Sequence, residues 1–376
     1  MITVLLSGGH LTPALALIDQ AIVDKKDFRF IFLGRKYSQE MSKQISQEQA
    51  EVEKRKVQFI ETQAPKFHKT YWWRNIIELR KIPRALIIAW KTVSRTKPDI
   101  FLSFGGYLAF PIALVCRIRQ IKVITHEQTV TKGLANQILS LLSDRIAVSH
   151  TSSLNLFPRH KSVLTGNPIR PSVLVKKADA PSWVDSYTTK PVLYITGGNQ
   201  GSEILNRVVE QTLQTLTAQW YVIHQCGNPS KTFNYNERLV TAQKLLPKNL
   251  QRSYVVRNWI AEKELAWIYL HATAAVSRSG ANTIQELTLH QLPAVLIPIP
   301  FSHNNEQQKN AEIMSNAKSA ILLHQKDLTP DTFLSALNSI KQKNVQMSKN
   351  AEKLKSKMIL NGAENLLSLI EQVVAS

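Results

Sequence analysis

Short apolar runs, rich in β-branched residues, alternate with longer amphipathic stretches along most of the chain. In the first half these runs predict strands at residues 2–6, 28–33, 58–62, 100–104, 122–125 and 145–148. In the second half they predict strands at residues 191–196, 220–225, 253–256, 274–277 and 294–297. Strands that alternate with helices are typical of parallel sheets covered on both faces. The pattern therefore predicts a doubly wound α/β fold.

The alternation weakens over residues 168–189, a stretch that carries prolines and lysines, and then restarts. This break predicts two Rossmann-like domains, residues 1–167 and residues 190–356, joined by a linker at 168–189. A length of 376 residues suits two or three domains. The remaining segment, residues 357–376, ends in a helical pattern, GAENLLSLIEQVV.

The longest uncharged run covers residues 100–116 and raises the question of a membrane span. A spanning helix needs about 20 apolar residues. This run has 17 and is interrupted by Gly105, Gly106 and Pro111. The interruptions predict a strand, a glycine loop and then a helix with Pro111 in its first turn. No transmembrane helix is predicted.

Composition narrows the class of protein. With 44% hydrophobic and 20% charged residues the chain is globular, which excludes a disordered tail, a collagen and a disulfide scaffold. Its two cysteines, Cys116 and Cys226, suit a reducing compartment, and no signal peptide is visible. The net charge is +20, with 26 basic and 12 acidic residues in 1–170 against 21 and 15 in 171–376. This surplus indicates an anionic partner: nucleic acid, a phosphate-bearing substrate or an acidic membrane.

The basic residues concentrate between Lys66 and Lys97, where nine lysines and arginines accompany a single acid, Glu78. Tryptophans among basic residues on a helix with an apolar face are typical of a helix bound at an anionic membrane surface. The residues predicted to contact the membrane are Trp72, Trp73, Arg74, Arg80, Lys81, Arg84 and Trp90. Two other interpretations are nucleic-acid binding, for which no known motif is present, and a core helix with a solvated basic face.

Glycine-containing turns follow three of the predicted strands, at residues 7–10, 197–201 and 277–281. Ligands of open α/β sheets bind beyond the carboxyl ends of the strands, and helix N-termini there receive phosphates. The turns match neither the phosphate-binding loop of nucleotide hydrolases nor the dinucleotide fingerprint. They favour a cleft that binds a nucleotide sugar or another phosphate, although such turns also use glycine for structural reasons alone.

Several polar residues stand at these strand ends. His10 is a candidate general base or a candidate hydrogen-bond donor to a phosphate. The alternative is a helix-capping residue. His126 and Glu127 are candidates for ligand contact, or a buried pair that satisfies itself. Glu286 lies where an acid could accept hydrogen bonds from a ribose diol. The amides of residues 304–310 suit sugar hydroxyls, or a solvated loop. No metal-ligand spacing is present, so neither a metal nor a cofactor is predicted.

Taken in order, these motifs resemble those of the MurG-type peptidoglycan N-acetylglucosaminyltransferases. The resemblance rests on SGGHLTPALAL, FGGYLAFP, HEQTVTKGLANQ, TGNPIRPSV, ITGGNQGSEILN, HQCGN, SRSGANTIQEL and PFSHNNEQQKNA, and it spans most of the chain. It implies the GT-B fold, in which two Rossmann-like domains face a cleft. It also implies that residues 357–376 form a helix that returns to the first domain.

The resemblance implies an inverting transfer of N-acetylglucosamine from UDP-GlcNAc to the muramoyl-pentapeptide carried on undecaprenyl diphosphate. The enzyme would work peripherally at the cytoplasmic face of the plasma membrane, without nucleic acid as a partner. The first domain would bind the lipid acceptor and the second would bind the donor. Such a role fits a basic chain whose cysteines suit a reducing compartment.

Site residues follow from the same resemblance. His10 matches the histidine proposed to assist the acceptor hydroxyl. Gly105, Gly106, Tyr107, His126 and Glu127 would contact the acceptor. The donor would be bound by Ser7, Gly8, Gly9, Thr129, Arg170, Asn199, Ile260, Ala281, Asn282, Thr283, Ile284, Gln285, Glu286, Gln307 and Gln308. Among these, Glu286 would hold the ribose and the two glutamines would hold the sugar.

Two departures from the family pattern leave alternatives open. The first glycine loop, Ser-Gly-Gly-His, is shorter than usual, and Thr129 replaces an asparagine that contacts the donor. One alternative is therefore a related transferase with another sugar or lipid acceptor. The other is a catalytically silent protein that keeps the fold and binds membranes.

Overall fold

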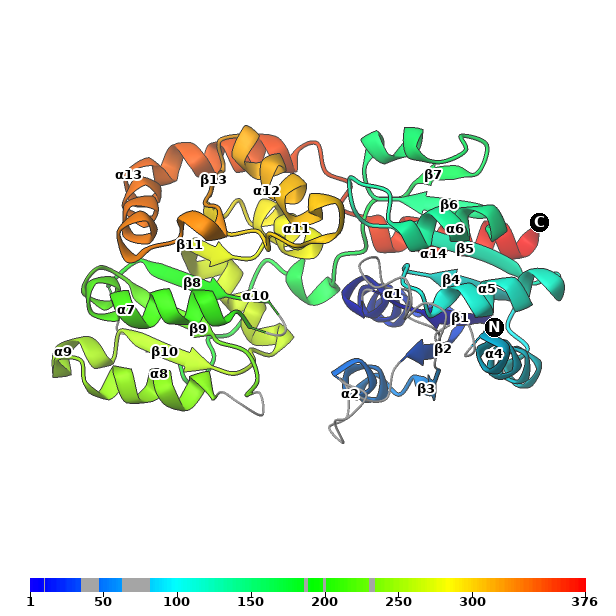
Figure 1. Cartoon of the computed structure of the whole chain (residues 1–376), viewed down its shortest axis with the longest axis horizontal. Coiled ribbons are helices and arrows are strands. Elements are labelled where there is room, and N and C mark those ends of the chain that lie inside the picture. The colour runs from blue at the N-terminus through cyan, green and yellow to red at the C-terminus, as the bar shows by residue number, and fades with distance from the viewer. Residues whose placement is uncertain (10, 35–46, 63–81, 186–188, 199–200, 230–233) are drawn as a thin grey trace. The chain divides into compact units, whose positions relative to one another are not determined.

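A computed structural model describes residues 1–9, 11–34, 47–62, 82–185, 189–198, 201–229 and 234–376. The chain folds into two compact units (Figure 1). Unit 1 comprises residues 1–171 and 359–376, and unit 2 comprises residues 172–358. The predicted linker at 168–189 is thus divided between the two units. Trp183 of this stretch donates a hydrogen bond from Nε1 to Glu264 Oε1 of unit 2 at 2.7 Å.

Within its described residues, unit 1 is a parallel seven-stranded sheet in the order β3-β2-β1-β4-β5-β6-β7. The strands are β1 (Ile2–Ser7), β2 (Phe28–Gly34), β3 (Gln58–Glu61), β4 (Ile100–Ser103), β5 (Lys122–Glu127), β6 (Arg145–Val148) and β7 (Ser162–Leu164). The helices are α1 (Leu11–Val23), α2 (Gln47–Lys54), α4 (Ile82–Thr96), α5 (Ala109–Ile118), α6 (Leu134–Leu142) and α14 (Gly362–Ala375), with 3-10 turns η1 (Thr151–Leu156) and η2, which falls at the unit boundary (Pro171–Val173).

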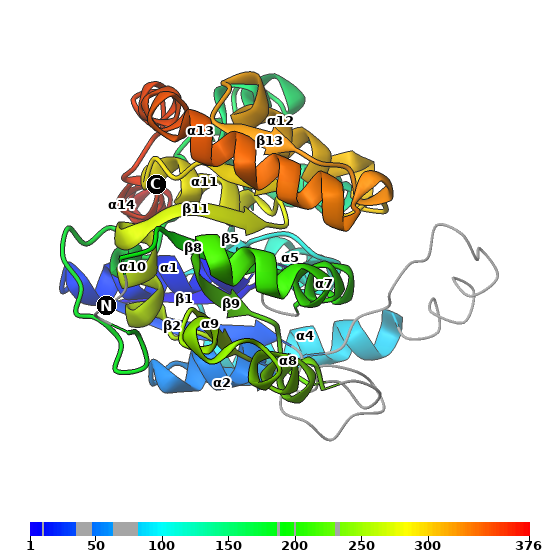
Figure 2. The same cartoon turned by 90° about the vertical axis from the view of Figure 1, so that its left-hand side faces the viewer.

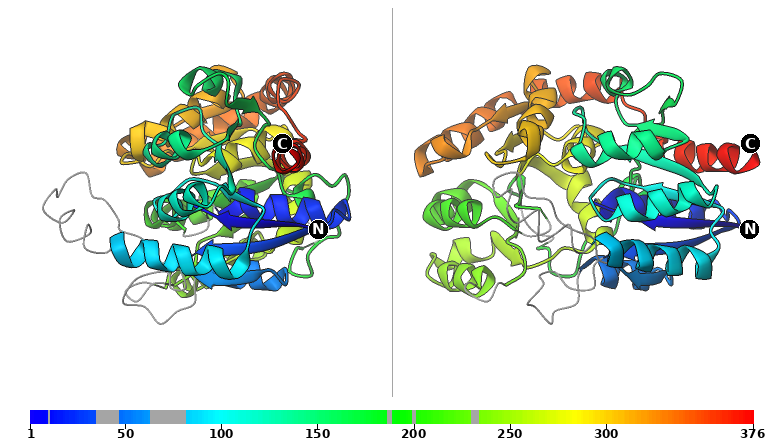
Figure 3. Two further views of the ribbon diagram at one scale, coloured as in Figure 1. Left: turned by 90° about the vertical axis from the view of Figure 1, so that its right-hand side faces the viewer. Right: turned by 45° about the vertical axis from the view of Figure 1, so that its right-hand side comes forward.

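Successive side chains of a central strand point to opposite faces of the sheet, so they enter two different apolar layers. Val4 and Leu6 of β1 pack with α1, α2 and α14 on one face. Leu5 packs with α4, α5 and α6 on the other face. The red helix α14 lies against the dark-blue α1 and supplies Leu366 and Ile370 to the first layer (Figure 3). Unit 1 therefore completes its core with a segment that follows unit 2 in the sequence.

Unit 2 has a parallel six-stranded sheet in the order β10-β9-β8-β11-β12-β13 within its described residues. Its strands are β8 (Val192–Thr196), β9 (Tyr221–Gln225), β10 (Tyr254–Arg257), β11 (Ala272–Ser277), β12 (Ala294–Leu296) and β13 (Ala320–Leu322). Its helices are α7 (Glu203–Gln219), α8 (Tyr235–Lys244), α9 (Lys248–Gln251), α10 (Glu262–His271), α11 (Ala281–Leu289), α12 (Glu306–Asn316) and α13 (Pro330–Lys355), with 3-10 turns η3 (His303–Asn305) and η4 (Gln325–Asp327).

The long helix α13 and helix α7 lie side by side in unit 2 (Figure 2). Both contribute to one apolar cluster that includes Leu193, Val222 and Phe333. Ser202 caps α7, since its Oγ accepts from the backbone N–H of Leu205 at 3.5 Å. Each sheet thus presents the carboxyl ends of its strands to loops that carry the predicted site residues.

The predicted strands are present, with ends that differ by one or two residues. The edge strands β7 and β13, three residues each, were not predicted. Helix α5 begins at Ala109 and places Pro111 in its first turn. Within the described ranges, no helix combines the length and the apolarity that crossing a bilayer requires.

Candidate active site

The first cluster of site residues lies at the carboxyl edge of the unit 1 sheet. In the parallel register Ser7 of β1 lies opposite Ser103 of β4, which lies opposite Thr125 of β5. The loops that follow these three strands therefore emerge together. They carry the residues predicted to contact donor and acceptor, from Ser7–Gly9, from 105–107 and from 126–129.

Two of these loops touch backbone to backbone. A Cβ placed on Gly9 would lie 2.9 Å from both Cα and N of Gly106, and a Cβ on Gly106 would lie 2.8 Å from Cα of Gly9. Gly105 and Gly106 have φ angles of 82° and 84°, which disfavour other residues. The structure thus brings together the glycines of two motifs that are almost 100 residues apart in sequence.

Ser7 ends β1 with a buried hydroxyl. Within the described residues Ser7 Oγ makes no hydrogen bond. A buried hydroxyl that is left unpaired costs free energy, on the order of 1–3 kcal/mol. This hydroxyl lies at the junction between β1 and the first glycine loop.

Glu127 is buried and forms the centre of a hydrogen-bond network. Its Oε1 accepts from the backbone N–H of Thr129 at 3.1 Å, and its Oε2 accepts from the N–H of Gly133 at 3.0 Å and from Asn136 Nδ2 at 2.9 Å. Asn136 Nδ2 also lies 3.2 Å from the His126 carbonyl oxygen. The carboxylate therefore shapes the loop between β5 and α6.

Thr129 shares this network. Its Oγ1 lies 2.8 Å from Glu127 Oε1 and 2.7 Å from the carbonyl oxygen of Thr131. A hydroxyl has one proton to donate, and both neighbours are acceptors on its own loop. The Thr129 side chain thus stabilises the loop from inside.

His126 points into the body of unit 1. Its Nε2 donates to the Gly166 carbonyl oxygen at 3.1 Å, and its ring lies 5.4 Å from that of Phe104. The side chain is 1% exposed. The ring thus stabilises the segment after β7, where the predicted donor residue Arg170 lies half-buried. Tyr107 is also half-buried, on the loop of Gly105 and Gly106.

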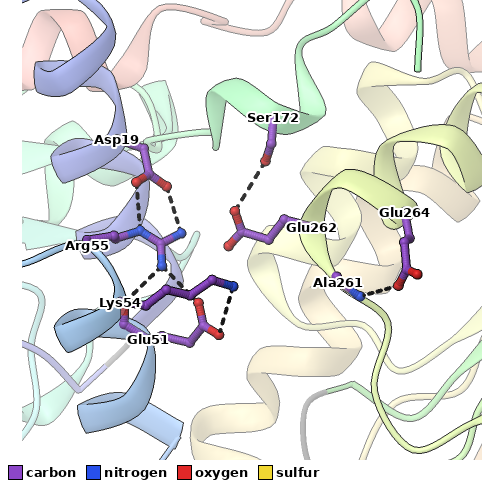
Figure 4. A network of polar contacts seen from close by, with 8 residues as sticks. All are labelled: Asp19, Glu51, Lys54, Arg55, Ser172, Ala261, Glu262 and Glu264. Atoms are coloured by element: carbon purple, nitrogen blue, oxygen red, sulfur yellow. Dashed lines mark hydrogen bonds and ion pairs between the residues drawn. The ribbon is translucent and has the colours of Figure 1, made fainter. Parts of the chain in front are cut away.

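Helix α2 is attached to α1 beside this sheet by Arg55. Its Nε and one terminal nitrogen donate to the two carboxylate oxygens of Asp19 at 2.6 and 2.8 Å, and its other terminal nitrogen donates to Glu51 Oε2 at 2.8 Å (Figure 4). The Arg55 side chain is 10% exposed. Bidentate, charge-assisted bonds of this kind fix the position of α1, whose N-terminus follows the first glycine loop.

The second cluster lies at the carboxyl edge of the unit 2 sheet, where Thr196, Ser277 and Leu296 are in register. Helix α11 begins directly after this edge, with Gly280 as its N-cap and no acidic residue in its first turn. The unpaired N–H groups of such a helix end and its dipole favour an anion. The predicted donor residues Ala281, Asn282 and Thr283 form this first turn, and Ile284 and Gln285 follow.

Arg278 sits under the same edge and joins three segments. One terminal nitrogen donates to the Ile297 carbonyl oxygen at 3.0 Å, and the other donates to Ser202 Oγ at 2.9 Å and Gln325 Oε1 at 2.8 Å. Burial lowers the pKa of this guanidinium below its usual value. Because these partners are neutral oxygens, a positive charge is held near the helix end that favours an anion.

Glu286 lies one turn further along α11 and is buried. Tyr269 Oη donates to Glu286 Oε2 at 2.9 Å. The Tyr269 ring stacks on His290 at 5.1 Å, and His290 Nε2 donates to the Val173 carbonyl oxygen at 2.9 Å. Burial lowers the pKa of His290, so that the ring is neutral near pH 7. This stack holds the carboxylate in place.

The amide-rich loop before α12 is braced by Gln307. Its Oε1 accepts from the N–H of Ile299 at 3.1 Å, while Ser279 Oγ donates to the Gln307 carbonyl oxygen at 2.7 Å. Gln308 Nε2 donates to Glu312 Oε1 at 3.1 Å. Asn304 and Asn305 turn the chain with φ angles of 51° and 55°. The two glutamines are therefore anchored beside the first turn of α11.

Ile260 precedes α10 and is 2% exposed. The next residue, Ala261, donates its backbone N–H to Glu264 Oε2 at 2.9 Å, and Glu262 Oε2 accepts from Ser172 Oγ at 3.4 Å (Figure 4). These bonds fix the entry to α10 directly after Ile260.

Some predictions fall outside the described residues. These are His10, Asn199, Trp72, Trp73, Arg74, Arg80 and Lys81.

The supporting residues Asn136 and Tyr269 were not singled out from the sequence. Asn136 lies within the quoted motif HEQTVTKGLANQ, whereas Tyr269 lies in no motif. The sequence therefore offered a signal for Asn136 alone.

Comparison with known proteins decides the family. The glycosyltransferase family 28 N-terminal domain matches residues 1–148, and the glycosyltransferase family 28 C-terminal domain matches residues 192–366. The chain belongs to glycosyltransferase family 28. It is therefore a glycosyltransferase, as the motifs predicted.

Relatives of this family 28 enzyme match over nearly its whole length. A Clostridium botulinum protein named UDP-N-acetylglucosamine--N-acetylmuramyl-(pentapeptide) pyrophosphoryl-undecaprenol N-acetylglucosamine transferase is 28% identical over 369 residues, 97% of this chain and 96% of that protein. The match confirms the predicted resemblance to the MurG-type family.

Solved structures show that the family 28 enzyme has the predicted GT-B fold. The crystal structure of Acinetobacter baumannii MurG matches with a TM-score of 0.71 at 21% identity and covers 99% of this chain and 100% of its own. A UDP-GlcNAc 2-epimerase from Neisseria meningitidis, bound to UDP-GlcNAc, matches with a TM-score of 0.65 at 12% identity, covering 99% and 100%. Since a transferase and an epimerase share this fold, the fold alone does not select the reaction.

Proposed function

We propose that this enzyme transfers N-acetylglucosamine from UDP-GlcNAc to the muramoyl-pentapeptide on undecaprenyl diphosphate, with inversion at the anomeric carbon. The observation that carries the proposal is the match over 97% of the chain to relatives whose name specifies this donor and this acceptor. The two site clusters support it, because each offers glycine-built loops or a helix N-terminus to a diphosphate.

Unit 2 would bind the donor. The first turn of α11 would receive the diphosphate, with the charge of Arg278 nearby. The Glu286 carboxylate would accept hydrogen bonds from the ribose hydroxyls, and Gln307 and Gln308 would hold the sugar. As the bond between the anomeric carbon and UDP breaks, negative charge develops on the leaving diphosphate. Preorganised donors at that point stabilise the transition state more than the ground state.

Unit 1 would bind the acceptor. On the loop that touches Gly9, the backbone of Gly105 and Gly106 would contact the acceptor. In the proposed reaction, the acceptor hydroxyl attacks the anomeric carbon as the bond to UDP breaks. His10 takes the hydroxyl proton or orients the group that does so. The sugar passes through a state with oxocarbenium character.

The deciding experiment is transfer of labelled GlcNAc from UDP-GlcNAc to a lipid I analogue. We expect a product that contains one added sugar, and a His10→Ala variant that makes it at least about 100-fold more slowly. Absence of transfer by the intact protein would overturn the proposed function. A His10→Ala variant with unchanged rate would overturn only the role of His10.

We also propose that the enzyme binds peripherally at the cytoplasmic face of the membrane, and helix α4 supports the contact with a membrane. Its exposed side carries both Ile87 (56% exposed) and Trp90 (47% exposed), with Arg84 and Lys91 beside them. The Arg119 guanidinium lies 5.3 Å from the centre of the Trp90 ring. Apolar and basic groups on one exposed face suit lipid headgroups of negative charge.

We predict that the double substitution Arg84→Glu and Lys91→Glu weakens binding to phosphatidylglycerol vesicles by at least about tenfold. Each basic residue near such a surface contributes about 1 kcal/mol. Co-sedimentation at low ionic strength measures the effect. The matched control reverses Lys176 and Lys177, which are exposed in unit 2, and should leave binding nearly unchanged. Equal losses in the two variants would contradict a membrane surface on α4.

A second candidate is transfer of a different sugar by the same site. The observation that favours it is the Thr129 hydroxyl, whose hydrogen bonds lie within its own loop. Competition of UDP-glucose and UDP-galactose against labelled UDP-GlcNAc separates the candidates. Strong preference for UDP-GlcNAc supports the main proposal, and stronger inhibition by another sugar nucleotide supports the second candidate.

A further inference from the structure

A chain of buried hydrogen bonds runs behind the described residues of the second glycine turn in unit 2, 197–198 and 201–202, which are called the glycine loop below. His224 on β9 lies between Tyr254 on β10 and Asn206 on α7. Its Nδ1 is 2.8 Å from Tyr254 Oη, and its Nε2 is 3.0 Å from Asn206 Oδ1. The exposed fractions of the three side chains are 1% or less. None of the three belongs to the predicted site.

The directions of these hydrogen bonds follow from the side-chain amide of Asn206, whose two ends have different partners. Asn206 Nδ2 donates to the Cys226 carbonyl oxygen at 2.9 Å, which turns Asn206 Oδ1 toward His224. His224 Nε2 therefore donates, and the neutral ring accepts at Nδ1 from Tyr254 Oη. Burial lowers the pKa of His224 to about 3, so the ring is neutral in neutral solution. The chain thus runs in one direction, from Tyr254 to the backbone at Cys226.

That backbone is the surface on which the glycine loop rests. A Cβ on Gly201 would collide with the Cys226 carbonyl oxygen and would lie 2.9 Å from Gly227 Cα. Gln225 Nε2 also donates to the Gly198 carbonyl oxygen at 3.3 Å. Any movement of the Cys226 carbonyl would therefore displace Gly201.

The loop is connected in turn to the proposed donor site. Asn206 donates its backbone N–H to the Ser202 carbonyl oxygen at 2.9 Å, and Ser202 Oγ accepts from Arg278 at 2.9 Å. Arg278 precedes the N-terminus of α11. The buried chain is thus connected through Ser202 and Arg278 to the residues directly before α11, where the diphosphate is proposed to bind.

We propose that Tyr254, His224 and Asn206 are positioning residues that hold Gly198, Gly201 and Ser202, described residues of the second glycine turn, where they support binding of the donor diphosphate. The inference rests on the proposed function, because it assigns this loop to the donor. Three buried polar side chains cost desolvation that apolar residues of the same size would avoid. The chain ends on the carbonyl that supports the loop, which gives it a role beyond filling the core.

The test is Tyr254→Phe, which removes the hydroxyl and keeps the ring. We expect the dissociation constant for UDP and the KM for UDP-GlcNAc to rise about five- to tenfold. The kcat and the KM for the lipid I analogue should stay within about twofold, because the acceptor and the reacting groups are unchanged. Isothermal titration with UDP and steady-state kinetics measure these quantities.

Tyr221→Phe is the matched control. It removes a tyrosine hydroxyl from the same sheet, one that accepts from the Asp185 N–H at 2.9 Å away from the loop. Melting temperatures of both variants report stability. If Tyr254→Phe is destabilised and binds UDP as the intact protein does, or if Tyr221→Phe weakens UDP binding equally, the inference is overturned. Should Tyr254→Phe fail to fold, His224→Gln takes its place, with the same expected rise and the same control.

The two proposals fail in different ways. An intact protein that neither binds UDP nor transfers GlcNAc overturns the proposed function. An intact protein that does both, with a Tyr254→Phe variant whose UDP dissociation constant is unchanged, overturns only the positioning role.

Discussion

We expect Gly106→Ala to lower kcat/KM for sugar transfer by at least about 100-fold, equivalent to roughly 2.7 kcal/mol. The new Cβ would meet Cα of Gly9 at 2.8 Å, and the φ angle of 84° strains any residue other than glycine. The neighbouring atoms are backbone, so the two loops must separate. Displacements of about 1 Å at a substrate site can cost two orders of magnitude in rate.

Gly133→Ala is the matched control in the same unit. Gly133 has φ −66° and ψ 140°, which alanine adopts readily, and a Cβ there would meet only the Glu127 Oε2 atom, at 3.3 Å. We expect its activity to stay within about threefold of the intact enzyme. Steady-state transfer to the lipid I analogue, together with circular dichroism to verify folding, measures both. A folded Gly106→Ala variant with near-normal kcat/KM would show that the loop contact is unimportant for the reaction.

Glu286→Gln should reduce kcat/KM for UDP-GlcNAc by about 100-fold. Hydrogen bonds to a charged group contribute about 1.5–3 kcal/mol each, and the amide offers one acceptor oxygen in place of two. Tyr269 Oη, 2.9 Å from Oε2, already uses one acceptor position, so the amide is left with a poor match to a ribose diol. Initial rates at varied UDP-GlcNAc give the change.

A donor that lacks the ribose 2′-hydroxyl makes this prediction specific. If Glu286 binds the ribose, the intact enzyme should lose activity with the deoxy donor, and Glu286→Gln should lose little more when the two changes are combined. Glu210→Gln is the control substitution, because Glu210 pairs with Arg238 on the exposed face of α7. Fully additive losses would place Glu286 away from the ribose.

The sequence predicted the fold because each central strand is a short apolar run that is buried on both faces. The strands β7 and β13 escaped prediction because three residues, Ser162–Leu164 and Ala320–Leu322, are too few for a periodic signal. Their pairing is fixed by neighbouring strands, and this information does not lie within the segments themselves.

The glycine loops were predictable because they directly follow strands. Their contact with each other was not, because Gly9 and Gly106 are brought together by the pairing of β1 with β4. The inward orientation of Glu127 depends on Gly133 and Asn136, which lie at the start of α6. Similarly, Tyr269 reaches Glu286 from a different helix. Side-chain partners of this kind follow from tertiary packing, which the local pattern does not contain.

The placement of α14 has a consequence for how the protein is made. Leu366 and Ile370 of this helix belong to the apolar layer of unit 1, yet the ribosome delivers them only after the whole of unit 2. During synthesis unit 2 can close its core first, while unit 1 waits with part of one apolar face uncovered. Domains usually fold in the order of translation. Here the first unit to begin is the last to be finished, which makes its unfinished face a target for chaperones on the nascent chain.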